Sequence, residues 1–291
     1  MNVCKSSKVI ILFLLCNSCS FNNHRLMLLD NTKLVGLPAI VNASEYAVID
    51  TYFTESGLTV YELHYHTSKG KKKRTFVGIT KNPKKGLVIA FSGSDSKGDG
   101  ASDVILGTGT GYQQNWGAKF SLYSSYPIIA PDPPIFGSFP YEHITDASET
   151  LIDDICGVAT GIKFLKENNV QISSSWLTGG VSWGGNRAMM FAATIGNVRK
   201  AYISGASITK RWSTRFLPVD KWDDIGWDIP NIISSSKHVE WKFTYGHKDY
   251  MIENNPVPRA SDILGEIGLN YYEVGIGHTL VYEDLKSFLS E

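Results

Sequence analysis

Two kinds of apolar pattern follow one another along the chain. Segments 59–66 and 74–79 alternate apolar and polar positions, which predicts two antiparallel strands joined by a turn at 68–73. Short apolar runs follow, and these predict mostly buried strands. The predicted strands of this second kind lie at 86–91, 126–130, 175–178, 200–204, 239–244 and 270–274.

Helical patterns separate several of these strands. The longest predicted helix covers 146–168 and carries one apolar stripe, with acidic residues early in it. The stripe consists of Leu151, Ile155, Val158, Ile162 and Leu165. A second helix follows Ser182 and ends at Gly196, and a third closes the chain at 281–289. This alternation predicts an α/β fold in which helices cover both faces of a mostly parallel central sheet. No boundary divides 45–291, so we expect one domain.

The first 20 residues have the pattern of an export signal. Lys5 and Lys8 precede the apolar run 9–15, and small and polar residues follow at 17–20. The run is too short to span a bilayer. The alternative is a short membrane-associated or buried N-terminal helix. Residues 21–44 are then a polar linker to the folded domain.

Cysteine positions refine the expected location. Cys19 and the residues before it resemble the lipobox of bacterial lipoproteins, in which the cysteine becomes the lipidated N-terminus. The alternative is cleavage and release without lipid. We therefore expect an exported protein that is periplasmic, secreted or lipid-anchored to a bacterial membrane. Cys156 is the one cysteine of the body, so no disulfide can form within it, and its place in an apolar helix pattern predicts a core position.

Charge and composition limit the kinds of partner that the protein can bind. The 291 residues contain 28 Lys and Arg against 28 Asp and Glu, which gives a formal net charge of zero. This balance removes the electrostatic case for nucleic acid or an anionic membrane surface as the main partner. With 43% hydrophobic residues the chain can bury a sizeable core. These properties are typical of a globular protein of enzyme size.

The most specific local signal is Gly180-x-Ser182-x-Gly184, between a predicted strand and a predicted helix. A serine on so sharp a turn projects its hydroxyl above the edge of the sheet. Glycines are needed on both sides, because side chains there would collide with the neighbouring strand and helix. The helix N-terminus also favours negative charge that develops beside the serine. We therefore interpret Ser182 as a nucleophile.

A serine nucleophile needs a base that is held by a third group. Asp249 follows the strand predicted at 239–244, and His278 follows the strand predicted at 270–274. His247 lies too close to Asp249 in sequence to be its obvious partner, and His238 precedes its strand. The hypothesis is a triad of Ser182, Asp249 and His278.

From about residue 59 to the end, the chain resembles the α/β-hydrolase superfamily. Within it, the chain is similar to the dienelactone hydrolases, acetyl esterases and prolyl-oligopeptidase-like enzymes. The resemblance rests on the strand–turn–helix around Ser182 and on the order Ser182, Asp249, His278. It implies that His278 takes the proton of Ser182, that Asp249 orients His278, and that an acyl-enzyme forms without a metal or organic cofactor.

The resemblance also implies an oxyanion hole. Its donors would be the backbone N–H of Trp183 and the backbone N–H of Ser94. In the family, the loop after the strand that corresponds to 86–91 usually begins His-Gly, and the histidine supports the loop. Here Ser92-Gly93 stands in its place, a departure that concerns the second donor and leaves the triad residues unchanged.

Several residues are candidates for substrate binding. Phe136 and Phe139 lie in a proline-rich aromatic loop after the strand at 126–130, and tryptophans cluster in a lid-like excursion before the acid loop. These tryptophans are Trp212, Trp222 and Trp227. Packing of the lid on the body explains the aromatic residues equally well. Arg187 and Arg211 are expected to be solvated surface arginines, with binding of a substrate carboxylate as the alternative.

The sequence thus predicts a serine hydrolase that cleaves carboxylic esters of small molecules or glycans. Two alternatives stay open. One is a non-catalytic exported binding protein on a hydrolase scaffold, because fold does not fix function. The other is a peptidase of the prolyl-oligopeptidase-like type.

Overall fold

The computed structural model describes residues 44–67, 70–93, 100–106, 115–132, 147–206, 208, 229–249 and 260–291. The predicted export signal lies outside these residues, as does the linker apart from Ser44, so both stay predictions. None of the helices in the described ranges combines the length and the apolar character that crossing a membrane requires.

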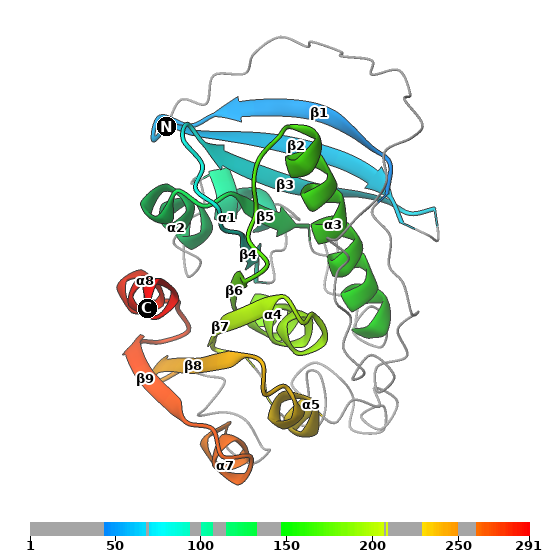
Figure 1. The fold of residues 1–291 in the computed structure, drawn as a ribbon. Helices are drawn as coiled ribbons and strands as arrows, with labels where there is room; N and C mark the ends of the chain where they lie inside the picture. The colour runs from blue at the N-terminus through cyan, green and yellow to red at the C-terminus, as the bar shows by residue number, and fades with distance from the viewer. Residues whose placement is uncertain are drawn as a thin grey trace.

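The described strands form one sheet in the order β1-β2-β3-β5-β4-β6-β7-β8-β9 (Figure 1). They are β1 (Tyr46–Phe53), β2 (Leu58–His66), β3 (Lys72–Thr80), β4 (Val88–Phe91), β5 (Ile128–Pro131), β6 (Trp176–Val181), β7 (Val198–Ser204), β8 (Glu240–His247) and β9 (Tyr271–Ile276). The first three strands are antiparallel, and β3 also pairs antiparallel with β5. From β5 to β9 every neighbouring pair is parallel. The predicted α/β fold with a mostly parallel sheet is confirmed.

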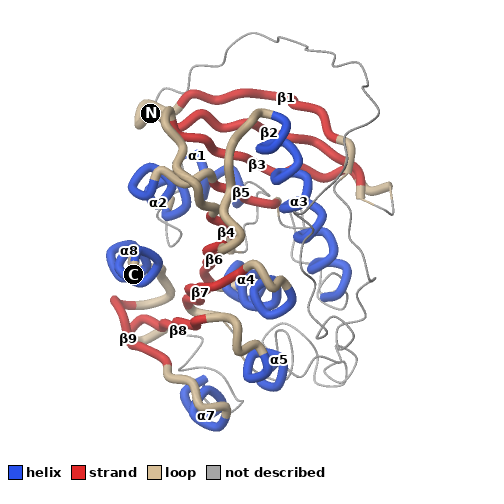
Figure 2. Tube along the Cα trace, viewed as in Figure 1, coloured by secondary structure: helices blue, strands red, loops and turns tan. Residues whose placement is uncertain are grey.

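Helices cover both faces of this sheet (Figure 2). The described helices are α1 (Gly100–Leu106), α2 (Trp116–Ser124), α3 (Ala147–Glu167), α4 (Trp183–Thr194), α5 (Ile229–Ser235), α7 (Ala260–Glu266) and α8 (Tyr282–Ser290). Figure 1 shows α1, α2 and α8 on one side of the sheet and α3, α4 and α5 on the other. Each group packs on its own apolar core, because successive side chains of a strand point to opposite faces.

The stripe predicted on the longest helix is buried. All five of its residues, Leu151, Ile155, Val158, Ile162 and Leu165, belong to the core between α3, α4 and the sheet. Cys156 lies beside them and is 4% exposed, so the prediction of a core cysteine is confirmed. This core holds α4, and therefore the turn that precedes it, firmly against the sheet.

One strand that the pattern did not predict is β1. Its side chains are half-buried or exposed along the whole strand, because it forms the edge of the sheet and pairs with β2 alone. Its sequence therefore lacks the regular alternation of buried apolar and exposed polar positions from which a strand is predicted. The lid-like excursion predicted around 212–227 lies outside the described residues.

Candidate active site

Ser182 occupies the turn between β6 and α4, as the motif predicts. Its backbone has φ +58° and ψ −128°, a conformation that residues with a side chain rarely adopt. Two hydrogen bonds hold it there: its N–H donates to the Ser204 carbonyl at 2.8 Å, and its carbonyl accepts from the Asn186 N–H at 3.2 Å. The side chain is half-buried. The turn is thus strained locally and fixed by its neighbours.

The glycines on both sides of Ser182 have no room for a side chain. A Cβ on Gly180 would lie 2.2 Å from the carbonyl oxygen of Gly184. A Cβ on Gly184 would lie 2.5 Å from the carbonyl oxygens of both Phe91 and Ser92. These are backbone atoms, which cannot move aside as a flexible side chain can. The predicted reason for glycine at both positions is confirmed.

Asp249 and His278 are hydrogen-bonded to each other. The Nδ1 atom of His278 lies 3.0 Å from Oδ1 and 3.1 Å from Oδ2 of Asp249. The aspartate is fully buried, and the histidine side chain is 8% exposed. A carboxylate at Nδ1 selects the tautomer with its proton on Nδ1, which leaves Nε2 as the acceptor. The pair therefore has the form of a general base with its orienting acid.

Neighbouring strand ends bring the pair to the edge of the sheet that carries Ser182. Gly205, which follows β7, has φ +57°, and a Cβ there would lie 2.7 Å from Cε1 of His278 and 3.1 Å from Oδ2 of Asp249. The preceding residue, Ser204, binds the N–H of Ser182 and donates its hydroxyl to the Thr279 carbonyl at 3.0 Å. The imidazole thus lies against the end of β7, next to the end of β6 that carries Ser182. The three predicted residues gather at the carboxyl edge of the parallel strands.

Tight turns place the acid and the histidine. The N–H of Asp249 donates to the Gly246 carbonyl at 2.9 Å across a turn in which Lys248 has φ +60°. The N–H of Gly277 donates to the carbonyl of His247 at 2.7 Å and so ties the histidine loop to the acid loop. Short loops closed by backbone hydrogen bonds hold both side chains on the rigid sheet.

Trp183 is the first residue of α4, so its backbone N–H is one of the free donors of that helix end. Its predicted role as an oxyanion donor stays a prediction. The other predicted donor, Ser94, lies outside the described residues. So do the candidate substrate-binding residues Phe136, Phe139, Trp212, Trp222 and Trp227, and Arg211. Within the described ranges, no three His, Cys, Asp or Glu side chains are grouped as metal ligands.

The expectation that Arg187 is a solvated surface arginine is wrong. Arg187 is 1% exposed, and its Nε and Nη2 donate to the Asp154 carboxylate at 3.0 and 2.5 Å. Burial raises the pKa of Asp154, and the charge of Arg187 opposes that rise. A buried charge needs such partners. The binding of a substrate carboxylate is excluded as well, because the guanidinium is enclosed and its nitrogens are already used.

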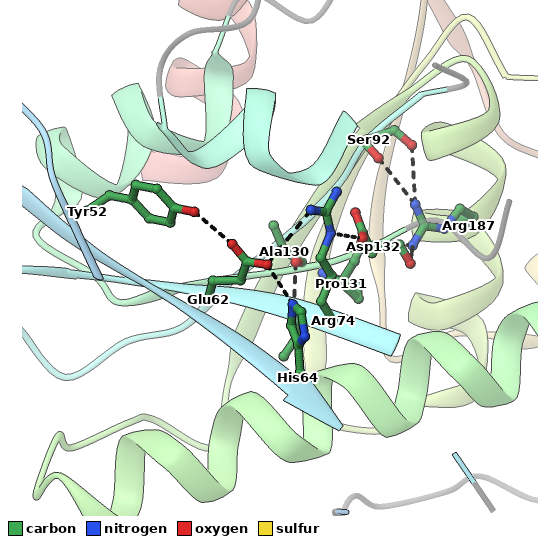
Figure 3. A network of polar contacts seen from close by, with 10 residues as sticks. Tyr52, Glu62, His64, Arg74, Ser92, Ala130, Pro131, Asp132 and Arg187 are labelled. Atoms are coloured by element: carbon green, nitrogen blue, oxygen red, sulfur yellow. Dashed lines mark hydrogen bonds and ion pairs between the residues drawn. The ribbon is translucent and has the colours of Figure 1, made fainter. Parts of the chain in front are cut away.

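A second polar network lies beside this pair and joins side chains of β1, β2 and β3 to Asp132, which follows β5 (Figure 3). Glu62 accepts from the Tyr52 hydroxyl at 2.7 Å and lies 2.6 Å from Nε2 of His64. Arg74 donates to Asp132, whose side chain is fully buried. Burial raises the pKa of Asp132 to about 7, although the charge of Arg74 favours its ionised form.

No protein-family model and no curated protein sequence matches the chain. Solved structures do match. Acetyl xylan esterase 1 from Thermoanaerobacterium sp. JW/SL YS485 superposes with a TM-score of 0.55 and 13% identity, over 90% of this chain and 98% of that one. The Pyrococcus furiosus esterase Pf2001 superposes with a TM-score of 0.53 and 15% identity, over 98% and 96%. The chain has the α/β-hydrolase fold. This confirms the fold that the resemblance implied.

Proposed function

We propose that this chain is a serine hydrolase that cleaves carboxylic esters. The observation that carries the proposal is the buried His278–Asp249 pair at the same edge of the sheet as Ser182, which lies on a strained strand-to-helix turn. The esterases with the same fold support the choice of ester chemistry. A site of this kind needs no metal or organic cofactor, because the acid, the base and the nucleophile are all side chains.

The first half of the reaction forms an acyl-enzyme. Ser182 Oγ attacks the acyl carbon while Nε2 of His278 takes the hydroxyl proton. Asp249 holds the imidazole in the required tautomer and stabilises its positive charge. The oxyanion accepts hydrogen bonds from the backbone N–H of Trp183 and from that of Ser94. As the tetrahedral intermediate collapses, His278 gives the proton to the alcohol that leaves.

The second half restores the enzyme. A water molecule attacks the acyl carbon, and His278 takes one of its protons. The second tetrahedral intermediate collapses, the bond to Ser182 Oγ breaks, and His278 returns the proton to that oxygen. The carboxylic acid then leaves. We propose short-chain esters of small alcohols or of glycans as substrates, on the strength of the acetyl xylan esterase among the structural neighbours.

Ester hydrolysis and active-site labelling test the proposal together. Wild type should hydrolyse p-nitrophenyl acetate and react with a fluorophosphonate probe, and peptide mapping should locate the probe on Ser182. Ser182→Ala should lose the labelling and about a million-fold in kcat. Ser290→Ala, which changes an exposed serine of α8, is the control and should keep both.

The alternatives predict other results. A peptidase would cleave peptide p-nitroanilides faster than the ester. A folded wild type that neither labels nor turns over esters would refute the proposal and favour a binding protein on this scaffold.

A further inference from the structure

Arg187 lies one helical turn after Trp183, so their side chains share one face of α4. The guanidinium carbon lies 5.4 Å from the centre of the Trp183 ring and 5.1 Å from that of Phe91. A buried cation close to two aromatic rings is attracted to the faces of both. One contact of Arg187 is therefore the side chain of the residue that follows the nucleophile.

The other side of the guanidinium faces the ends of two strands. Nη2 donates to the carbonyls of Pro131 and Asp132 at 3.1 and 3.3 Å. Nη1 lies 3.4 Å from the carbonyl oxygen of Ser92 and 3.5 Å from its hydroxyl oxygen. Figure 3 shows the two contacts between Ser92 and the guanidinium of Arg187. The contact to Pro131 has an ordinary hydrogen-bond length and the other three are long, and the full positive charge strengthens each of them.

Ser92 is closely packed as well as hydrogen-bonded. A Cβ on Gly184 of α4 would lie 2.5 Å from its backbone, and a Cβ on Gly100 of α1 would lie 2.9 Å from its side chain. Ser92 thus lies between two helices, and the side chain of Arg187 is the charged group that binds it. The chain passes through Ser92 and Gly93 on its way to the second proposed oxyanion donor.

These contacts give Arg187 a position between the two sides of the proposed oxyanion hole. Trp183 carries one donor, and Ser92 begins the loop that carries the other. Resemblance to the hydrolase family leads one to expect a histidine at position 92 as the support of this loop, and the sequence has serine there. A guanidinium from α4 supplies hydrogen bonds to the same residue.

We propose that Arg187 is a positioning residue for ester hydrolysis: its guanidinium, held by Asp154, fixes Ser92 and Trp183 relative to each other. The inference rests on the proposed function. Arg187 is buried and touches no reacting atom, so it acts through the geometry of the two backbone donors. Loss of one oxyanion donor costs about 100- to 1000-fold in rate, and a misplacement of 1 Å costs about 100-fold.

The test separates positioning from stability. Arg187→Lys keeps the charge but loses the planar fork, and we expect kcat for p-nitrophenyl acetate to fall about 10- to 100-fold with KM within about twofold. The double variant Arg187→Met with Asp154→Leu removes both buried charges, a change that often leaves stability unaltered or improved. We expect it to fold and to keep the low kcat.

Lys73→Met is the matched control. It removes another buried cation, which pairs at 3.1 Å with Asp153, the neighbour of Asp154 in α3. We expect it to lose stability and to keep wild-type kcat. Hydrogen exchange adds a readout that is independent of turnover: exchange should rise in peptides covering 91–93 and 183–187 in both Arg187 variants and stay unchanged there in Lys73→Met.

Three results would overturn this inference and leave the proposed function intact: wild-type kcat in Arg187→Lys, wild-type kcat in the double variant, or unchanged hydrogen exchange at Ser92 and Trp183. The failure of the proposed function looks different, because wild type would then show no hydrolysis that depends on Ser182, and the role of Arg187 in that reaction would fall with it.

Discussion

Gly205→Ala is expected to disable the site while the protein stays folded. The new Cβ would lie 2.7 Å from Cε1 and 2.8 Å from Nδ1 of His278, and 3.1 Å from Oδ2 of Asp249. Carbon atoms in ordinary contact are about 3.5–4.0 Å apart, so the imidazole must move by about 1 Å. Such a displacement of a catalytic group costs about 100-fold in kcat/KM.

The same substitution carries a separate cost in stability. Gly205 has φ +57°, and an alanine in this left-handed region costs about 1–2 kcal/mol. Gly57→Ala provides the matched control: Gly57 has φ +91°, lies in the turn between β1 and β2, and a Cβ there would meet no other atom within 4 Å. It should lose comparable stability and keep the wild-type rate.

Steady-state hydrolysis of p-nitrophenyl acetate and urea unfolding, measured on both variants, check the two expectations. The reasoning fails if Gly205→Ala keeps the wild-type kcat/KM, because His278 would then tolerate a side chain at Gly205. It also fails if Gly57→Ala loses activity to the same degree, because backbone strain alone would then explain the effect.

Three further predictions concern single side chains. Asp249→Asn should lower kcat about 10,000-fold with the fold intact, because the amide cannot hold the required tautomer of His278; circular dichroism and kcat check this. Ser182→Gly should be about 1–3 kcal/mol more stable to urea than Ser182→Ala, because glycine relieves the strain at φ +58°. Asp132 has a pKa of about 7 when folded against 3.8 ordinarily, so the folded state binds its proton more tightly. The contribution of Asp132 to the free energy of unfolding therefore falls as pH rises from about 4 to 7. The free energy of unfolding of Asp132→Asn, taken relative to wild type, should rise by at most about 4 kcal/mol over that window and then level off. A constant difference across urea titrations at these pH values would contradict it.

Local patterns were sufficient for much of this fold. The five-residue stripe of α3 is continuous at helical spacing, and helical geometry alone puts it on one face. Gly180 is equally local, because its close contacts are Gly184 and Gly185 of the adjoining helix, whereas the close contacts of Gly184 come from Phe91 and Ser92, far away along the chain. Asp249 and His278 could be predicted for a related reason: each follows a strand, and parallel strands end at one edge of a sheet.

Arg187 could not be predicted in this way. Its partners Asp154, Asp132 and Ser92 lie 33, 55 and 95 residues away along the chain. A lone arginine in a helical pattern gives no sign of which distant carbonyls will surround it, and exposed arginines are far commoner than buried ones. Strand β1 was missed for another reason, because an edge strand has little to bury and so leaves a weak hydrophobic pattern.

The strained serine shows how the parts of the site depend on one another. A residue other than glycine in the conformation of Ser182 costs about 1–3 kcal/mol and persists only where its surroundings over-determine it. Here β7 binds its N–H, α4 binds its carbonyl, and Gly184 allows α4 to pack directly on Ser92. Arg187, from the same helix, then links Ser92 to Asp154 on α3. The strain is thus balanced by contacts from a parallel sheet and two helices, which explains why the nucleophile lies on a closely packed turn rather than on an independent loop.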